Sequence, residues 1–144
     1  MYESWDTDFI VKMSLDQVNL LIEEARRKFP IEICGGLFGI INGKEVLVKK
    51  ISFLRNVLAS RELFEVDPEE FLAEFIKSER EGLQHIGFFH SHPGTTEPSK
   101  IDLKFMELWP GTIWLIISSL NRNIAAYRIV NGKLRLVYIR ILHV

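Results

Sequence analysis

Two histidines, His90 and His92, stand two positions apart in the second half of the chain. Side chains of residues i and i+2 on an extended chain point to the same side, so both imidazoles can face one point. Two converging imidazoles are a common half of a zinc site, and zinc accepts a carboxylate oxygen as a further ligand. Asp102 and Glu97 lie close downstream and are the candidate carboxylates. By itself the histidine pair does not establish a metal site.

The polar residues and glycines around this pair also have structural interpretations. Ser99 and Asp102 have the spacing of a helix capping box, in which each side chain binds a backbone N–H of the other residue. Glu32, beside an expected strand, fits an ordinary solvated carboxylate. Gly35 and Gly39 are typical of bulges or of close approach between backbones. Taken singly, these residues do not decide between chemistry and structure.

Three helices that would help to position these residues are indicated by their start signals. Ser14 begins a capping box ahead of apolar residues at helical spacing, and Pro30 closes this first helix. Asp67 as N-cap, with a proline directly after it, predicts a second helix that ends at Gly82. A third helix is predicted over residues 99–108. The buried stripe of the second helix is predicted to be Phe71, Leu72, Phe75 and Ile76.

Apolar runs predict strands at residues 9–11, 34–41, 45–53, 84–90, 112–118, 124–130 and 133–142. Asn-Gly pairs after the second and sixth runs predict hairpins, because both turn positions favour positive φ. The fifth run is nearly all apolar, which is typical of a central strand buried on both faces, whereas residues 55–64 read as irregular. The order β-α-β-β-α-β-α-β-β-β, without repeats or linkers, predicts one α/β domain with a mixed sheet over residues 1–144.

Composition limits the classes of function. The chain has 144 residues, 47% of them hydrophobic and 26% charged, which is typical of a soluble globular protein. A formal net charge of −1 argues against a nucleic-acid binder with a large phosphate-contacting surface. The single cysteine, Cys34, excludes a disulfide framework or a Cys-rich zinc site and is predicted to be a small buried residue. Without a signal sequence, or an apolar run near the ~20 residues of a membrane span, a cytoplasmic location is expected.

In combination, these residues resemble the signature of the JAMM (MPN-plus) metalloproteases. The family pattern is His-x-His-Pro, a short loop and Ser-x-x-Asp, with a glutamate far upstream. The chain matches it with His90-Ser91-His92-Pro93, Ser99 and Asp102, and its stretch Pro-Ile-Glu32-Ile-Cys-Gly-Gly-Leu-Phe-Gly is similar to the family's Pro-x-Glu-x-x-Gly-x-Leu-x-Gly. The resemblance covers nearly the whole chain. It implies the JAB/MPN fold, a mixed β-sheet flanked by helices within the cytidine-deaminase-like superfold.

The resemblance implies a role for each matching residue. His90, His92 and Asp102 would bind one Zn²⁺ per chain, with a water in the fourth position. Glu32 would act as general base, and Ser99 would donate a hydrogen bond to the oxyanion. The chain departs from the pattern at one place, since six residues separate His92 from Ser99 where typical members have seven. This difference affects the substrate contacts of the loop more than the ligand set.

By resemblance, the bond cut is the isopeptide or peptide bond after the C-terminal Gly-Gly of a ubiquitin-like modifier, so the partner is this modifier or its protein conjugate. The extended tail would add to a sheet edge, for which strand 45–53 is the candidate. One alternative keeps the chemistry but releases a C-terminal cysteine from a sulfur-carrier protein. Another is a non-catalytic MPN scaffold, which the presence of both His-x-His and the aspartate disfavours.

Other classes and partners are weighed on single residues. A zinc base deaminase is excluded, because its Pro-Cys-x-x-Cys motif needs more cysteines than Cys34. Neither nucleic acid nor a membrane is expected as a partner. Trp109 is a candidate either for the core or for the contact of a possible homodimer.

Overall fold

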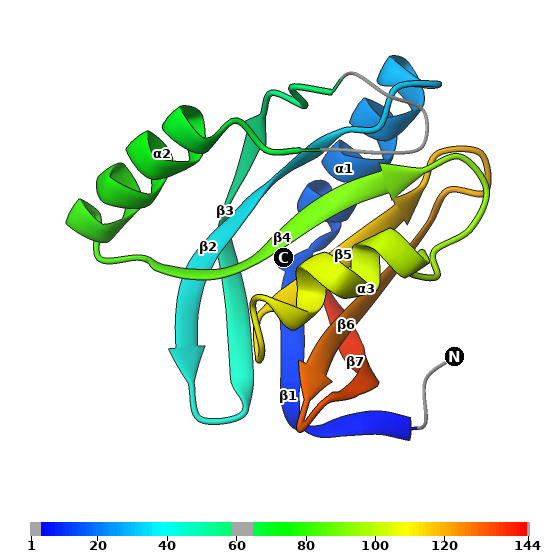
Figure 1. Ribbon diagram of the computed structural model, residues 1–144. Coiled ribbons are helices and arrows are strands. Elements are labelled where there is room, and N and C mark those ends of the chain that lie inside the picture. The colour runs from blue at the N-terminus through cyan, green and yellow to red at the C-terminus, as the bar shows by residue number, and fades with distance from the viewer. Residues whose placement is uncertain (1–3, 59–64, 144) are drawn as a thin grey trace.

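The computed structural model describes residues 4–58 and 65–143. Within them the elements follow the predicted order and are shown in Figure 1: β1 (Ser4–Ser14), α1 (Leu15–Lys28), β2 (Cys34–Asn42), β3 (Glu45–Leu54), α2 (Pro68–Arg80), β4 (Gln84–His92), α3 (Lys100–Glu107), β5 (Ile113–Ser118), β6 (Asn123–Val130) and β7 (Lys133–Leu142). The predicted α/β fold with a mixed sheet is confirmed. Residues 59–64 of the segment predicted to be irregular lie outside the described residues.

The strands are ordered β1-β3-β2-β4-β5-β6-β7, and β7 pairs with β1 in parallel, which closes the sheet into a ring. β4 lies between β2, to which it is antiparallel, and β5, to which it is parallel. Helix α1 packs on one face of the sheet, whereas α2 and α3 cover the other, with α3 in front of β5 and β6 in Figure 1. As predicted, β5 is buried along its whole length. In the described residues no helix combines the length and the apolar character needed to cross a membrane.

Helix α2 buries a narrower face than its sequence predicts. Phe71 and Phe75 are half-buried and Ser78 is fully buried, at the i, i+4 and i+7 positions of one stripe. Leu72 and Ile76 are 58% and 42% exposed, so the prediction that they belong to the buried stripe is wrong. Each lies one position, or about 100° of helix rotation, beyond the contact line. Apolar character alone did not reveal this offset.

The two predicted hairpins are present, but their turns differ. In the β6–β7 hairpin Asn131 and Gly132 are the two central residues, and both have positive φ as predicted. In the β2–β3 hairpin Asn42 pairs with Glu45, so the turn is Gly43-Lys44 and only Gly43 has positive φ. A glycine at the first central position is the requirement of a type II′ turn. The prediction of two positive φ values at Asn42-Gly43 is therefore wrong.

Glycines in β2 allow the strand to lie unusually close to its neighbours. A Cβ atom added to Gly35 would lie 2.0 Å from the Ser52 carbonyl oxygen, and one added to Gly39 would lie 1.9 Å from the Leu47 carbonyl oxygen. The register of the β2–β3 pair shifts at Gly39, as expected of a bulge. The prediction of close backbone approach is confirmed, and Cys34, which precedes Gly35, is buried as predicted.

His85 lies inside a cluster of aromatic side chains between α2 and the start of β4. Its ring centroid is 4.7 to 6.1 Å from those of Phe38, Phe71, Phe75, Phe88 and Trp109. Its Nε2 atom lies 2.8 Å from the Gly87 carbonyl oxygen, so this nitrogen carries the proton of the neutral ring. Burial lowers the pKa of His85 to about 4. The neutral imidazole is the form that the fold stabilises.

We expect this lowered pKa to make the fold less stable in acid. The unfolded chain binds a proton at His85 below pH ~6.5 and the folded chain only near pH 4, so stability rises with pH over this window. Between pH 7 and pH 4 the loss from this residue is about 3 kcal/mol. Urea unfolding of the metal-free protein across this range measures it. His85→Phe should show a shallower dependence on pH, and an unchanged slope would contradict the prediction.

Candidate metal centre

Strand β4 carries both histidines, because it extends two residues beyond the predicted end to reach His92. His90 and His92 are 0% and 8% exposed, and their ring centroids lie 4.9 Å apart. β4 is paired on both sides, with His90 opposite Cys34 on β2 and His92 opposite Ser118 on β5. The prediction that the two imidazoles share one side of an extended chain is confirmed, and a doubly paired strand fixes their spacing.

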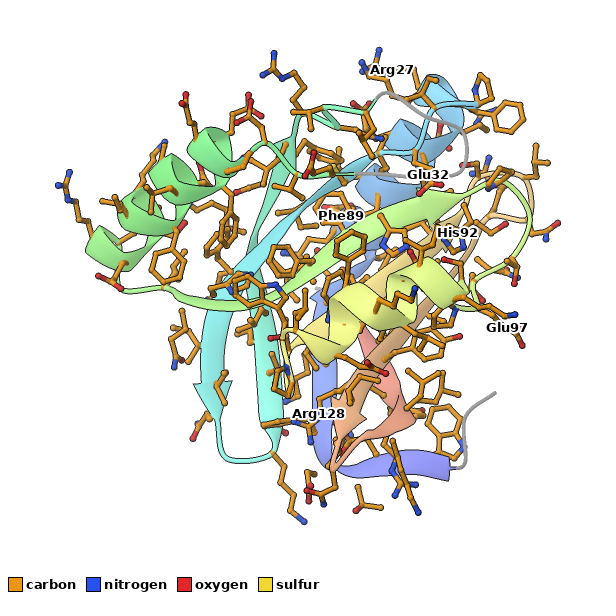
Figure 2. All side chains as sticks on the ribbon, in the orientation of Figure 1. Arg27, Glu32, Phe89, His92, Glu97 and Arg128 are labelled. Carbon is orange, nitrogen blue, oxygen red and sulfur yellow. The ribbon has the colours of Figure 1, made fainter. Side chains whose placement is uncertain are left out.

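The carboxylate that meets these histidines is that of Asp102, in the first turn of α3. Its Oδ2 atom is 3.1 Å from His90 Nε2 and 3.0 Å from His92 Nε2. Helix α3 is oriented by its capping box, in which Ser99 N–H donates to Asp102 Oδ2 at 2.9 Å and Asp102 N–H donates to Ser99 Oγ at 3.0 Å. Glu97, the other candidate, is exposed and points away from Glu32 and His92 in Figure 2.

Glu32 lies in the short connection between α1 and β2 and faces the same site. It is 4% exposed, and one of its carboxylate oxygens lies within 4.8 Å of a ring nitrogen of each histidine. Figure 2 shows it beside His92 at the end of β4. The structure therefore brings together the predicted residues Glu32, His90, His92 and Asp102 from three separate segments of the chain.

Ser99 stands at the rim of the site as the N-cap of α3. The capping interpretation is correct, because its hydroxyl oxygen accepts the N–H of Asp102. A hydroxyl group accepts through its lone pairs and still has its own proton to donate. The cap and a hydrogen bond to a reacting oxygen therefore need not compete for this side chain, and the helix N-terminus adds positive potential there.

Burial and the shared carboxylate determine how the site is charged. Burial lowers the pKa of His90, which keeps this ring neutral. Burial also opposes the charged form of His92, but its hydrogen bond to Asp102, the nearby Asp102 and Glu32 charges and a hydrogen bond with the Thr95 backbone raise its pKa overall. Burial opposes ionisation of Asp102 as well, yet the two histidines hold the pKa of its carboxyl group well below its usual range. The site is thus built around an ionised carboxylate.

The donor set fits a zinc ion. Atoms bound to one tetrahedral zinc at ~2.0–2.1 Å lie roughly 3.3 Å apart, close to the spacing of the two Nε2 atoms from Asp102 Oδ2. Two imidazoles and one carboxylate are a ligand set of catalytic zinc sites, which keep a further position open.

Comparison with known proteins agrees with this geometry. The family model for prokaryotic homologues of the JAB domain matches residues 15–130, which include all the residues of the site. The chain belongs to this family.

Two curated relatives of this JAB-domain protein are named desampylase. The one from Pyrococcus furiosus is 46% identical over 89 residues, 61% of this chain and 60% of that protein. The one from Haloferax volcanii is 36% identical over 91 residues, 62% of this chain and 63% of that protein. The match therefore spans less than two thirds of either relative.

Solved structures share the fold of this JAB domain over nearly its full length. A protein from Desulfitobacterium hafniense, determined in solution, superposes with a TM-score of 0.83 at 27% identity and covers 94% of both chains. A JAB1/MPN domain protein from Archaeoglobus fulgidus superposes with a TM-score of 0.58 at 18% identity, over 95% of this chain and all of the other.

The short loop of this JAB domain, residues 93–98, is fixed at its start by the turn between β5 and β6. The Ser119 and Leu120 N–H groups donate to the His92 and Pro93 carbonyl oxygens at 2.8 and 2.9 Å. The Asn121 side chain also donates to the Gly94 carbonyl oxygen. These contacts direct the loop back toward α3, so six residues are enough to bring Ser99 and Asp102 to the site.

Sequence reasoning gave no role to two residues that contact the segment of Glu32. Asn56 Nδ2 donates to the Glu32 carbonyl oxygen at 3.1 Å, and Ser91 Oγ accepts the Ile33 N–H at 2.9 Å. These contacts join residues 24 and 58 positions apart, so no local pattern indicates them. The one sequence feature that could have drawn attention to either residue is the hydroxyl-bearing side chain of Ser91 between the two histidines.

Proposed function

We propose that this JAB-domain protein is a zinc-dependent hydrolase that cuts the isopeptide or peptide bond after the C-terminal Gly-Gly of a ubiquitin-like modifier. One observation carries the proposal. The Asp102 oxygen and the Nε2 atoms of His90 and His92 converge, with the Glu32 carboxylate within 4.8 Å of the two histidines. Membership of the family and the two relatives named desampylase support the same reaction.

In this mechanism His90, His92 and Asp102 hold the metal, and the other polar groups act on protons and charge. A bound zinc ion would lower the pKa of a coordinated water from ~15.7 toward ~7. Glu32, buried beside the histidines, accepts the proton of the attacking water and returns it to the leaving amine. The Ser99 hydroxyl donates a hydrogen bond to the carbonyl oxygen as that oxygen gains negative charge.

The surroundings of Glu32 provide space for an extended substrate on two sides. A hollow of about 310 Å³ lies between α1 and the end of β3 and is lined by Glu32, Phe53 and Asn56 among others. A second hollow, of about 450 Å³, is lined by Glu32, His92, residues 93–95 and 97–98 of the short loop, and Ser99. Glu32 borders both, so a chain that crosses the site occupies one hollow on each side of the scissile bond.

The pairing of β3 supports the proposal that the modifier tail adds beside this strand. It pairs with β1 only over Glu45 to Leu47, and in the described residues no other strand pairs with this edge further along β3. The first of the two hollows lies where β3 ends, at Phe53 and Leu54. A tail added beside β3 would therefore lead toward Glu32, with main-chain hydrogen bonds supplying affinity.

We expect Ser99→Ala to lower turnover by about 10²-fold, the effect of losing one oxyanion donor. It also removes the N-cap of α3, which costs about 1 kcal/mol of stability. Steady-state rates and urea unfolding measure the two effects separately. Ser14→Ala is the matched control, because Ser14 makes the same capping box at the start of α1. Turnover lowered equally by both substitutions would contradict a role for the Ser99 hydroxyl in the reaction.

The proposed function is tested by incubating the zinc-loaded protein with three substrates. One is a ubiquitin-like protein joined through its C-terminal Gly-Gly to a lysine side chain, one is the same protein fused to a peptide, and one is a carrier that ends in Gly-Gly-Cys. Mass spectrometry identifies the products. Release of the modifier with a free Gly-Gly end supports the proposal. Cleavage of the Gly-Gly-Cys carrier alone would replace it with carrier processing, and no cleavage of any substrate would refute it.

A further inference from the structure

The peptide unit that follows Glu32 is held on both sides by side chains from elsewhere in the chain. Its carbonyl group, on Glu32, accepts a hydrogen bond from Asn56 Nδ2 at 3.1 Å. Its N–H group, on Ile33, donates to Ser91 Oγ at 2.9 Å. Ile33 precedes the first residue of β2, so the peptide lies just outside the regular strand. Neither contact is part of the β-ladder.

The side chain of Ser91 takes the place of a main-chain acceptor. The Ser91 N–H donates to the Ile33 carbonyl oxygen at 3.0 Å, which is one half of the reciprocal pair expected between antiparallel strands. The Ile33 N–H is accepted by the Ser91 hydroxyl oxygen. Ser91 is 1% exposed, and strand alternation directs its side chain away from the side on which His90 and His92 lie. Its hydroxyl is therefore outside the ligand set.

The orientation of the Asn56 amide is fixed by its other hydrogen bonds. Asn56 Oδ1 accepts the N–H groups of Leu58 and Glu65, both at 3.1 Å. An amide oxygen accepts and an amide nitrogen donates, so with Oδ1 assigned by two donors, Nδ2 must face the Glu32 carbonyl oxygen. The contact to Glu32 is thus a specific hydrogen bond.

We propose that Ser91 and Asn56 are positioning residues that fix the Glu32–Ile33 peptide and, through it, the Glu32 carboxylate relative to His90 and His92. The inference rests on the proposed role of Glu32 as general base. The carboxylate is joined to this peptide by a flexible side chain, so a turn of the peptide displaces the point from which that side chain reaches into the site. A misplacement of about 1 Å at a reacting group lowers rates by about 10²-fold.

The test uses the zinc-loaded full chain and the modifier–peptide fusion as substrate. Ser91→Ala and Asn56→Ala should lower kcat by roughly 10- to 10²-fold with zinc content unchanged, because they move Glu32 but not the ligands. Ser91 lines neither hollow, so Ser91→Ala should also leave KM unchanged. Ser91→Thr keeps the acceptor oxygen and should restore most of kcat. Ser78→Ala removes another fully buried serine hydroxyl, on α2 away from the site, and should leave kcat unchanged.

A second comparison separates positioning from general damage to the fold. In a Glu32→Gln background, Ser91→Ala and Asn56→Ala should cause no further loss of the residual rate, because both act through the carboxylate that is already absent. A further loss equal to that in the wild type would overturn the proposal. An unchanged kcat for both substitutions in the wild type would overturn it equally.

The hydrogen bond itself is tested without substrate. Hydrogen exchange of the Ile33 amide should be at least 10-fold faster in Ser91→Ala than in the wild type, whereas Ser78→Ala should not change it. Equal exchange in the wild type and Ser91→Ala would overturn the inference even if the enzyme is active. Faster exchange, together with a wild type that cuts no substrate, would instead place the failure in the proposed function.

Discussion

Glu32→Gln should lower kcat for the modifier conjugate by about 10²- to 10⁴-fold, the contribution of a well-placed general base. The amide matches the carboxylate in size, so it fills the same buried space beside His90 and His92. It cannot accept the proton of the attacking water. Because Glu32 is not one of the three proposed ligands, zinc should stay bound at about one ion per chain. Single-turnover rates and metal analysis of the same sample measure both results.

The control for this substitution is Glu79→Gln, an equal loss of one carboxylate on the exposed side of α2. It should leave rate and zinc content as in the wild type. Full activity in Glu32→Gln would remove Glu32 from the mechanism. Loss of zinc together with loss of activity would show that Glu32 is a metal ligand. This is the main alternative to the general-base role, because a Glu32 oxygen lies within 4.8 Å of both histidine nitrogens.

Asp102→Asn should remove both zinc and activity. The carboxylate supplies the charged oxygen that both histidine Nε2 atoms approach within 3.1 Å, and a neutral amide oxygen is a weaker ligand for zinc. Loss of an outer contact to a ligand already lowers metal affinity about 10- to 100-fold, so loss of a direct ligand should exceed this range. Competition with a chelator of known zinc affinity measures the change.

Asparagine retains an oxygen that can accept the Ser99 N–H, so α3 should keep its cap in this variant. Asp16→Asn is the matched control, because Asp16 is the acidic residue in the first turn of α1. It should leave zinc affinity unchanged. If Asp102→Asn bound zinc as tightly as the wild type, a residue other than Asp102 would have to complete the coordination of zinc by the two histidines.

Much of this site could be predicted because its signals are local. The spacing of His90 and His92 needs only strand alternation, and the Ser99–Asp102 spacing serves the cap of a helix and the site at once. Sequence distance alone could not choose between Asp102 and Glu97, and only the resemblance of Ser99 and Asp102 to the family pattern selected Asp102. The choice depends on where the loop is fastened to the β5–β6 turn, through Ser119 and Leu120, which no motif indicates.

The parts that could not be predicted depend on contacts between distant segments. Asn56 and Ser91 meet the Glu32 segment across 24 and 58 positions, so each looks ordinary in its own neighbourhood. The exposed side of α2 at Leu72 and Ile76 was missed for the same reason, since the offset is set by how the helix packs on the sheet. Closure of the ring by β7 and β1 is likewise invisible to strand prediction, which gives the strands but not their partners.

That ring has a consequence for the order in which the chain can fold during synthesis. β1 precedes the other strands of the ring in the chain, yet one of its two neighbours is β7, which follows all of them. The buried ion pair between Asp6 on β1 and Arg128 on β6 likewise joins residues 122 positions apart. Until β7 is available, β1 has one edge without its native partner, and unpaired edges favour association between chains. The strand with the two histidines depends on β2 and β5, which are both made before β7. The histidine strand can therefore find its native neighbours on a nascent chain whose sheet is still open.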